Sequence, residues 1–319
     1  MPIYNCASFL DESVGSVLAQ TFRDYELIVV DDGSSDGSWE MLQAFSDKRI
    51  RTFRFPQNCG VAFVRNFAVE QADCEHLAFL DADDIAGRGR LEAQVDWLAC
   101  RTDLGAAISR VWILESDRMY KQPFLPLKPE EISATLLFRN PIVQSTVLMR
   151  RESWGAARDE FKAASDYELW ARSTPKLRFG LLKSALVTYR VHSGGISKRI
   201  SGSAKEAVRQ IHQKQIERLG VQPKLELHAM LSAWPPDASS EQLNEAELWL
   251  RELLCANRIY DAPSLRRVIE RIWHRICLDS WLLGPRAFHI YRRSVLARLT
   301  PGRMGGFFRR FGKRAFTGR

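Results

Sequence analysis

Two short apolar segments of this chain each lead directly into a cluster of aspartates, and this pattern restricts the fold most. Residues 26–30 (Glu-Leu-Ile-Val-Val) precede Asp-Asp-Gly-Ser at 31–34, and residues 76–80 (His-Leu-Ala-Phe-Leu) precede Asp-Ala-Asp-Asp at 81–84. Short apolar runs that stop at turn residues are typical of buried strands. Because segments with helical spacing separate them, we predict an α/β fold with a mostly parallel sheet and helices on both faces.

The pattern changes near residue 200, where strand signals stop and helix signals take over. An apolar stripe at helical spacing then follows, formed by Leu265, Val268, Ile269, Ile272 and Ile276. A length of 319 residues allows two domains of ordinary size. We therefore expect an α/β domain over residues 1–200 and a helical C-terminal region over residues 201–319.

The positive charge of the chain is concentrated at its C-terminal end. Residues 280–319, the basic tail, hold ten Lys and Arg and no Asp or Glu, whereas the whole chain has 46 basic and 38 acidic residues. The remainder is close to neutral, which argues against binding of nucleic acid by the whole protein. Aromatic residues lie among these cations, including Phe288, Tyr291, Phe307, Phe308 and Phe311. Such a segment can bind an anionic membrane surface, or it can pack on the protein and leave its charges in solvent.

Hydropathy and cysteine spacing indicate where the protein works. No segment reaches the roughly 18 apolar residues of a membrane-spanning helix, and no basic stretch followed by an apolar one opens the chain. The six cysteines form no Cys-x-x-Cys pair. We expect a cytoplasmic protein that the basic tail can hold on the inner face of the cytoplasmic membrane.

The carboxyl ends of the two predicted strands are the places where open α/β sheets bind ligands. Three carboxylates within four residues, Asp81, Asp83 and Asp84, repel one another unless a cation is present. Oxygen ligands of this kind select Mg²⁺ or Mn²⁺, and such an ion could clamp a diphosphate. Turn residues that merely end strands would give a similar pattern, but two clusters on neighbouring strands weaken this interpretation.

Five sequence motifs in a fixed order resemble those of the family 2 glycosyltransferases. They are residues 2–5 with 13–22, residues 26–38, Asn58-x-Gly60, Arg65-Asn66 and residues 79–84 (Phe-Leu-Asp-Ala-Asp-Asp). The resemblance covers residues 2–200 and implies a GT-A fold, a nucleotide-sugar donor, a divalent metal ion and inversion at the anomeric carbon. It further implies a UDP-linked donor, a saccharide or lipid-linked saccharide as acceptor, and a role in bacterial cell-surface polysaccharide or lipopolysaccharide synthesis.

The resemblance also implies roles for particular residues in donor binding. Asp32 matches the aspartate that contacts the nucleobase. The other donor-binding positions are Pro2, Tyr4, Asn5, Asp31, Arg65, Asp81 and Arg190. Arg65 would face the donor phosphates, unless it is an ordinary arginine on a helix surface. Arg190 or His192 would reach the same phosphates, although a histidine near a strand end is commonly structural.

The segment from Asp81 to Asp84 resembles the D-x-D element of the family. There, one carboxylate meets the ribose and another holds the Mn²⁺ or Mg²⁺ that bridges the donor phosphates. We assign the metal to Asp83 and Asp84, and the motif alone does not separate them from Asp81.

An inverting transfer needs a base on the face of the sugar opposite the departing nucleotide. Residues 164–172 (Ala-Ser-Asp-Tyr-Glu-Leu-Trp-Ala-Arg) resemble the family segment that carries this base, which makes Asp166 the catalytic base. Ser165 and Glu168 stand where the family has acids, and they have the spacing of a helix capping box. Asp166 would then be an acid in the first turn of a capped helix, a position compatible with catalysis.

The chain departs from the family at its beginning, where only Met1 precedes the motif at residues 2–5. The family has a full apolar strand there, in the centre of the sheet. Without it, the neighbouring strands would leave N–H and C=O groups unpaired inside the domain. We expect a late start codon or a truncated gene, and a chain that truly began at Met1 could be a catalytically impaired homologue.

Two other classes of function share part of this pattern. A nucleotidyltransferase would use the same layout and carboxylates, but it usually has a glycine-rich phosphate loop, which the sequence does not contain. A nucleic-acid-binding protein could use the basic tail, but the tail matches no known nucleic-acid-binding module. We therefore predict a metal-dependent glycosyltransferase with no nucleic-acid partner.

Overall fold

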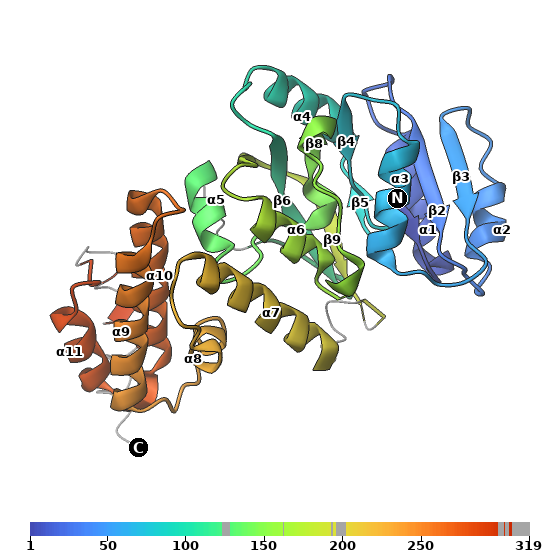
Figure 1. Cartoon of the computed structure of the whole chain (residues 1–319). Coiled ribbons are helices and arrows are strands. Elements are labelled where there is room, and N and C mark those ends of the chain that lie inside the picture. The colour runs from blue at the N-terminus through green and yellow to red at the C-terminus, as the bar shows by residue number, and fades with distance from the viewer. Residues whose placement is uncertain are drawn as a thin grey trace. The chain divides into compact units, whose positions relative to one another are not determined.

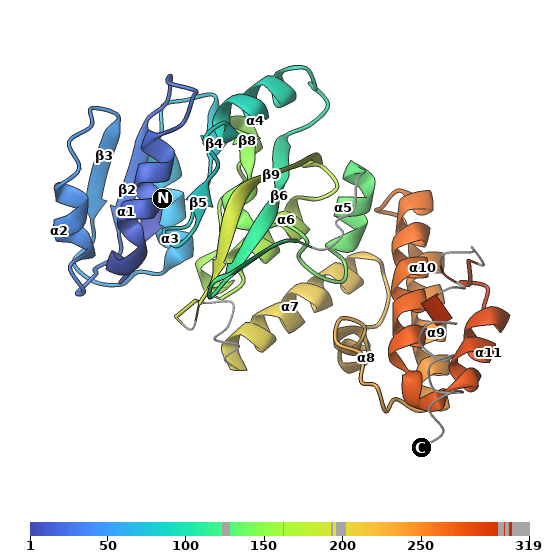
Figure 2. The ribbon, with the colours of Figure 1, turned by 180° about the vertical axis from the view of Figure 1, so that it is seen from behind.

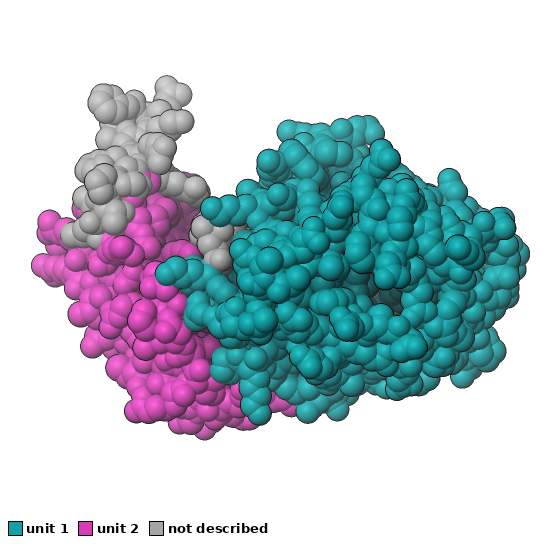
Figure 3. Space-filling model, turned by 90° about the horizontal axis from the view of Figure 1, so that it is seen from above, with its two compact units in different colours: residues 1–132, 140–208 teal, residues 133–139, 209–319 magenta. Residues whose placement is uncertain are grey.

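The computed structural model describes residues 1–122, 128–161, 163–192, 194–195, 202–298, 303 and 306–307. The chain forms two compact units (Figure 3). The first contains residues 1–132 and 140–208, and the second contains residues 133–139 and 209–319. The sequence carried no signal that residues 133–139 pack with the second unit rather than with their neighbours in the chain.

The first unit begins with a parallel sheet in the order β1-β2-β3, of which Figure 1 labels β2 and β3. Its strands are β1 (Pro2–Ile3), β2 (Leu27–Asp31) and β3 (Ile50–Arg54), and the helices between and after them are α1 (Ala7–Leu18), α2 (Ser38–Gln43) and α3 (Val61–Gln71). Every residue of β2 is buried. Leu10 and Val14, on one stripe of α1, are buried in the same core as Val29. This apolar contact fixes the ends of β1 and β2 beside each other.

A second sheet follows in the order β4-β8-β6-β9-β5, and Figure 2 shows its two long strands β6 and β9 side by side. The strands are β4 (His76–Ala78), β5 (Ile85–Ala86), β6 (Ala106–Glu115), β7 (Arg118–Lys121), β8 (Leu148–Arg150) and β9 (Phe179–Val191). The α/β fold is thus confirmed. In this second sheet, however, only β6 and β9 pair in parallel. One cause is the tight turn at residues 116–117, because such a turn can join only antiparallel strands.

The segment of residues 144–149 is only partly a strand. The chain forms a 3-10 turn, η1 (Gln144–Thr146), before β8 begins. The Thr146 hydroxyl donates to the Val143 carbonyl at 2.7 Å, and the Ser145 hydroxyl accepts from the Asp81 amide at 3.0 Å. Hydroxyl side chains that bond the local backbone compete with a ladder in this way. The turn therefore supports the end of the segment that follows β4.

Further helices complete the first unit or lead into the second. They are α4 (Arg90–Ala99), α5 (Pro129–Thr135), α6 (Ser165–Ser173) and α7 (Gly202–Arg218), with 3-10 turns at η2 (Arg151–Ser153) and η3 (Asp159–Phe161). Helix α4 packs against β6, β8 and β9. Trp170 of α6 is fully buried and meets Phe179 of β9 edge to face, with 5.2 Å between ring centroids. This contact fixes α6 beside the sheet.

The second unit is helical, with its own core around Trp249 and Trp273. Its helices are α8 (Leu225–Met230), α9 (Ser240–Ala256), α10 (Ala262–Asp279) and α11 (Pro285–Arg293), with a 3-10 turn at η4 (Trp281–Leu283). The predicted apolar stripe of α10 is confirmed, since its members are buried or packed against this core. Helix α9 begins with a capping box between Ser239 and Gln242.

The described part of the basic tail divides into a buried and an exposed side. Tyr291 and Phe307 are buried and their ring centroids lie 5.0 Å apart, with Phe288 tilted against Phe307 at 5.1 Å. Arg292 and Arg293 are exposed. These three aromatic residues therefore pack within the unit. Phe308 and Phe311 lie outside the described residues.

Candidate active site

The turn after β2 is held together by its own carboxylates. Asp32 is buried, and its two oxygens accept the amide protons of Cys59 at 2.7 Å and Gly60 at 2.9 Å. These bonds fix the loop that leads into α3. Asp31 is fully buried, and its Oδ1 accepts the Ser34 amide at 3.1 Å while its Oδ2 lies 3.1 Å from Nε of Arg54.

Glycine is required at position 33 of this turn. Gly33 has a φ of +75°, and a Cβ atom there would lie 2.8 Å from the backbone of Gln57. Both the left-handed conformation and the close approach exclude a side chain. The Asp-Asp-Gly-Ser sequence therefore specifies one compact backbone shape at the end of β2.

The loop after β1 is joined to the same turn. The Asn5 amide donates to the Ser34 hydroxyl at 3.0 Å, and Oδ1 of Asn5 accepts the Ser35 amide at 2.9 Å. Asn5 has a φ of +48°, and Tyr4 beside it is 51% exposed. The predicted donor-binding residues Pro2, Tyr4, Asn5, Asp31 and Asp32 thus gather at one end of the first sheet.

Arg65 and Asp81 form an ion pair after β4. Nη2 of Arg65 lies 2.6 Å from Oδ1 of Asp81. The Arg65 side chain, on α3, is only 9% exposed, and its Nε atom has no hydrogen-bond partner within the described residues. Arg65 is therefore not a helix-surface arginine, and it keeps a donor for another group.

The next two aspartates differ in exposure. Asp84 is fully buried, and its Oδ1 accepts the Arg190 amide at 3.0 Å while its Oδ2 has no hydrogen-bond partner among the residues described. Burial raises the pKa of Asp84 well above its ordinary value, and the charges of Asp81 and Asp83 add to this rise. The Asp83 side chain is 31% exposed, and its Oδ2 lies 3.0 Å from Nε2 of His192.

Arg190 holds the end of β9 against this cluster. Its Nε donates to the Asp83 carbonyl at 3.0 Å, its Nη2 pairs with Glu12 at 2.5 Å, and its guanidinium lies 5.0 Å from the ring centroid of Phe9. The Phe9 ring also lies 4.5 Å from the ring of His192. Arg190 and His192, which were both predicted to reach the donor phosphates, thus contact Asp83 directly.

Asp166 lies near the start of α6. The amide of Asn140 donates to its Oδ2 at 2.9 Å, and Oδ1 of Asn140 accepts the Ile142 amide at 3.0 Å, which fixes the orientation of the Asn140 side chain. Burial raises the pKa of Asp166, the Arg65 charge opposes this rise, and the Asp81 charge adds to it. These electrostatic interactions connect Asp166 with the Arg65–Asp81 pair.

The capping box expected at residues 165–168 is absent from the described structure, and this expectation was wrong. The residue before the first turn of α6 is Ala164, whose side chain cannot accept a hydrogen bond. Glu168 instead pairs with Nε of Arg172 at 2.7 Å, one helical turn further on. Because Ser165 is the first residue inside the helix and not its N-cap, Ser165 and Glu168 are one position out of register for a capping box.

Sequence reasoning missed Asn140 and Ser145, which support Asp166 and the backbone of Asp81. Both lie in or beside the weakly patterned region before β8, so no periodicity drew attention to them. Within the described ranges, no group of three or more His, Cys, Asp or Glu side chains stands close enough to hold a metal ion by itself.

Residues of this site are similar in sequence to those of a known protein family. The family model described as Glycosyl transferase family 2 matches residues 1–154, which include both aspartate turns. The chain is thus similar to glycosyl transferase family 2 over residues 1–154. It is a glycosyltransferase with a GT-A fold, as the motifs predicted.

Individual relatives of this glycosyltransferase are similar over most of their length. The putative teichuronic acid biosynthesis glycosyltransferase TuaG of Bacillus subtilis is 28% identical over 73% of this chain and 90% of its own. The UDP-Glc:alpha-D-GlcNAc-diphosphoundecaprenol beta-1,3-glucosyltransferase WfaP of Escherichia coli is 29% identical over 65% of this chain and 80% of its own.

A solved structure shares the fold of this glycosyltransferase. The mannosyltransferase PcManGT from Pyrobaculum calidifontis, in complex with GDP-Man and Mn2+, superposes with a TM-score of 0.54 over 100% of this chain and 86% of its own. Its sequence is 18% identical, so this likeness concerns the fold alone.

Proposed function

We propose that this glycosyltransferase moves a sugar from a nucleotide diphosphate to a hydroxyl group, with inversion at the anomeric carbon. The observation that carries the proposal is the arrangement after β4. Asp83, Asp84, Arg65 and Asp166 surround the Asp81 turn, and together they offer oxygen ligands, a cation and a carboxylate with a raised pKa. Transfer of a sugar from a diphosphate needs these three kinds of group.

The carboxylate oxygens of Asp83 and Asp84 are suitable ligands for a divalent ion, but the two side chains differ in how available they are. Asp83 presents a partly exposed carboxylate beside a histidine nitrogen, and Asp84 has a buried oxygen without a partner of its own among the described residues. Mn²⁺ or Mg²⁺ held here would neutralise charge on the donor diphosphate as the nucleotide leaves. We assign the ion first to Asp83, and Asp84 second, because Asp84 already holds the β9 backbone. The Mn2+ in the complex of PcManGT is consistent with a divalent ion here.

The donor would extend from this turn toward the ends of β1 and β2. At that end the Tyr4 side chain is exposed, and Asn5, with a φ of +48°, joins its loop to the turn after β2. Asp31 and Asp32, being committed to backbone amides, would shape the nucleobase site through the turn that they hold. Arg65 would direct its free Nε toward the diphosphate, and Arg190 would position Asp83.

Asp166 would act as the base. Its carboxylate would accept the proton of the acceptor hydroxyl while that oxygen attacks the anomeric carbon and the nucleotide diphosphate leaves from the opposite face. Asn140 donates to one carboxylate oxygen and thereby leaves the other available for the acceptor. A pKa raised by burial makes the carboxylate a stronger base than an exposed aspartate.

The names of the relatives suggest the chemistry of the substrates. WfaP uses UDP-Glc and a diphosphoundecaprenol-linked sugar, and TuaG is named for teichuronic acid synthesis. We infer a UDP-linked donor and a saccharide or lipid-linked saccharide acceptor in cell-surface polysaccharide synthesis. We also propose that residues 1–200 form the catalytic domain and residues 201–319 a helical C-terminal region. No described helix is both long and apolar enough to cross a bilayer.

Release of nucleotide from a panel of nucleotide-sugars, with Mn²⁺, Mg²⁺ or chelator, tests the proposal. We expect UDP release that requires the ion and an added acceptor, and Asp83→Ala should lose at least 100-fold of this activity. Asp96→Asn, an exposed position on α4, is the control. Release of pyrophosphate from a nucleoside triphosphate would instead indicate a nucleotidyltransferase.

The basic tail provides a second, separable test. Arg292 and Arg293 are exposed on α11, and each cation near an anionic membrane contributes on the order of 1 kcal/mol. We expect flotation with vesicles that contain anionic lipid, reduced by a joint exchange of both residues to Gln. The matched control exchanges Arg251 and Arg266, exposed arginines of the same unit. Equal loss in both pairs would contradict a specific role of the tail.

A further inference from the structure

Three long polar side chains are buried in and beside helix α4, and the mechanism above uses none of them. Gln20, Arg90 and Gln94 are each at most 2% exposed. Arginine and glutamine are seldom buried to this degree unless other groups of the protein bond them. The bonds that these side chains make therefore show what they hold in place.

Arg90, the first residue of α4, holds the end of β4. Its Nη2 donates to the Phe79 carbonyl at 2.9 Å and to the Val147 carbonyl at 3.2 Å. The Val147 carbonyl also accepts the Phe79 amide at 3.0 Å. Burial lowers the pKa of Arg90 only to about 10, so the guanidinium is charged at neutral pH. A charged donor makes a stronger hydrogen bond than a neutral one.

Gln94, one helical turn further along α4, holds the η1 turn. Its Nε2 donates to the Thr146 carbonyl at 2.8 Å and to the Ala107 carbonyl of β6 at 3.0 Å. Its Oε1 accepts Nε–H of Arg90 at 2.9 Å. The two side chains therefore act together and tie η1 to both α4 and β6.

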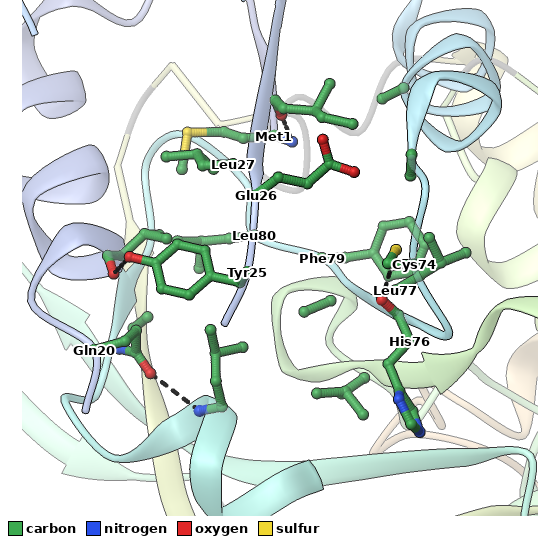
Figure 4. Close-up of a pocket in the computed structure, with 18 of the residues that line it drawn as sticks. Met1, Gln20, Tyr25, Glu26, Leu27, Cys74, His76, Leu77, Phe79 and Leu80 are labelled. Carbon is green, nitrogen blue, oxygen red and sulfur yellow. Dashed lines mark hydrogen bonds between the residues drawn. The ribbon is translucent and has the colours of Figure 1, made fainter. Parts of the chain in front are cut away.

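Gln20 fixes the start of α4. Its Oε1 accepts the Leu91 amide at 3.0 Å, the bond that is drawn from Gln20 in Figure 4, and its Nε2 donates to the Gly87 carbonyl at 2.8 Å. An amide in the first turn of a helix has no partner within the helix, so this bond satisfies it. Arg90 and Gln94 thus project from a helix whose first turn is held.

The opposite side of the β4 segment gives less support. A cavity of about 860 Å³ lies between β2 and this segment, with Leu27 on one side and Leu77 and Phe79 on the other (Figure 4). Atoms that line a cavity lose the van der Waals contacts that close packing would supply. The position of the β4 end therefore depends on the bonds from β8, η1 and α4.

Ser145 connects this network with the Asp81–Asp84 turn. Its hydroxyl accepts the Asp81 amide at 3.0 Å, and the carbonyls of the two residues after it are those that α4 bonds. A shift of η1 would therefore displace the Asp81 backbone, together with the carboxylate that pairs with Arg65.

We propose that Arg90 and Gln94 are positioning residues for sugar transfer, which fix the Asp81–Asp84 turn through η1 and Ser145. This inference rests on the proposed function, in which that turn binds the donor diphosphate and a divalent ion. Both residues are buried, so they act on the donor through the turn and not by contact. A site that must hold a diphosphate and an ion at several points tolerates only small displacements. The base Asp166 is held by Asn140 instead, so the acceptor side is independent of this network.

Binding of UDP in the presence of Mn²⁺, measured by calorimetry, tests the inference without any transfer. Gln94→Leu removes the three bonds of the Gln94 side chain, and we expect the Kd for UDP to rise roughly tenfold. The matched control is Arg150→Leu, because Arg150 also donates to two backbone carbonyls of the first unit, those of Leu98 and Leu104. The control should lose comparable thermal stability, with a Kd that stays within about twofold.

Ser145→Ala tests the route to the donor turn. This variant loses the acceptor of the Asp81 amide, so its Kd should rise as well. The double variant with Gln94→Leu should bind UDP little worse than Gln94→Leu alone, because both changes break one chain of contacts. If Gln94→Leu does not fold, Arg90→Lys takes its place, since lysine keeps the buried charge but is shorter and lacks the donor to Gln94.

Three outcomes would overturn the inference. They are an unchanged Kd in Gln94→Leu or its replacement, an equal loss of affinity in Arg150→Leu, and effects of Gln94→Leu and Ser145→Ala that multiply independently. An unaltered protein that did not bind UDP with Mn²⁺ would overturn the proposed function, and this inference with it, before any variant is compared.

Discussion

The turns at the ends of β2 and β4 look alike in the sequence, but they differ in how many of their carboxylate oxygens are already used. After β2, both oxygens of Asp32 and one oxygen of Asp31 accept backbone amides. The second oxygen of Asp31 also has no hydrogen-bond partner among the described residues, but it lies 3.1 Å from Nε of Arg54, whose positive charge offsets its own. After β4, Asp83 is partly exposed and Asp84 has an oxygen without a hydrogen-bond partner among the described residues. The first turn is committed to its own structure, whereas the second keeps capacity for a ligand.

This difference changes what an aspartate cluster means in a sequence. A carboxylate saturated by backbone amides stabilises a loop and gains little from a cation. A carboxylate buried near other carboxylates is destabilised as an anion until a cation or a proton arrives, and the raised pKa of Asp84 expresses this cost. We therefore expect substitutions in the two turns to act on different measurable quantities.

The largest effect is expected at Asp166, which faces the second turn. Asp166→Asn should lower sugar transfer by roughly 10²- to 10⁴-fold, because the amide cannot accept the proton of the acceptor hydroxyl. The Kd for the nucleotide donor should stay within about twofold, measured by calorimetry with Mn²⁺. Near-normal transfer by this variant would remove Asp166 from the mechanism.

The next effect concerns stability and the first turn. Asp32→Asn should lower the free energy of unfolding by roughly 2–3 kcal/mol, because one of the two backbone amides would then face an NH₂ group instead of an acceptor. Urea denaturation of this variant and of Asp96→Asn, an exposed control, measures the difference. If Asp32→Asn were as stable as the control, the two turns would not differ as described.

A smaller effect on pH dependence is expected at Asn140. Removal of its hydrogen bond destabilises the carboxylate form of Asp166, so Asn140→Ala should raise the pKa of Asp166 further. A base works only when deprotonated, so the acid limb of the kcat/KM profile should move to higher pH.

Asn66→Ala is the matched control for the Asn140 test. Asn66 bonds the backbone of Ala157 through both side-chain atoms, so its loss costs comparable hydrogen bonds elsewhere in the unit. We expect this variant to be less stable with an unchanged pH profile. The same shift in both variants would mean that Asn140 acts through general stability.

The smallest effect is expected at Asp84, with a sign opposite to that at Asp32. Burial raises the pKa of Asp84, so its contribution to stability is present below its ordinary pKa and is lost as pH rises through the raised value. Asp84→Asn keeps the acceptor for the Arg190 amide and removes the charge. In metal-free protein at pH 7.5 the thermal midpoint should rise by roughly 2–4 °C, and the gain should vanish near pH 3. A lower midpoint at pH 7.5 would contradict the proposed cost of the Asp84 charge.

Much of the fold could be predicted because it depends on local patterns. Three segments have a structure that a few neighbouring residues specify: the apolar run of β2, the helical stripe of α10 and the Asp-Asp-Gly-Ser turn. The mostly antiparallel pairing of the second sheet could not be predicted in this way. Strand pairing depends on which distant segments meet, and short strands such as β4 and β8 carry little information about their partners.

The site was predictable to a similar degree and for the same reason. Motifs identified Asp83, Asp84 and Asp166 as candidates, but their spacing gave no sign of which oxygens the backbone would occupy. Asn140 was missed because its bond to Asp166 joins residues 26 positions apart, without any periodic signal. The capping box at Ser165 and Glu168 was wrong because the helix begins at Ser165, which makes Ala164 the N-cap residue.

By itself, the sequence determined the order of elements, the family motifs, the position of the turns and the candidate carboxylates, since each of these depends on neighbouring residues. Only the tertiary structure decided that Asp32 is committed to Cys59 and Gly60 and that Asp84 keeps a free oxygen among the described residues. It also decided that a cavity separates β2 from β4. Hydrogen-bond satisfaction and burial are properties of the packed chain, because the groups that supply them come from segments far apart in the sequence.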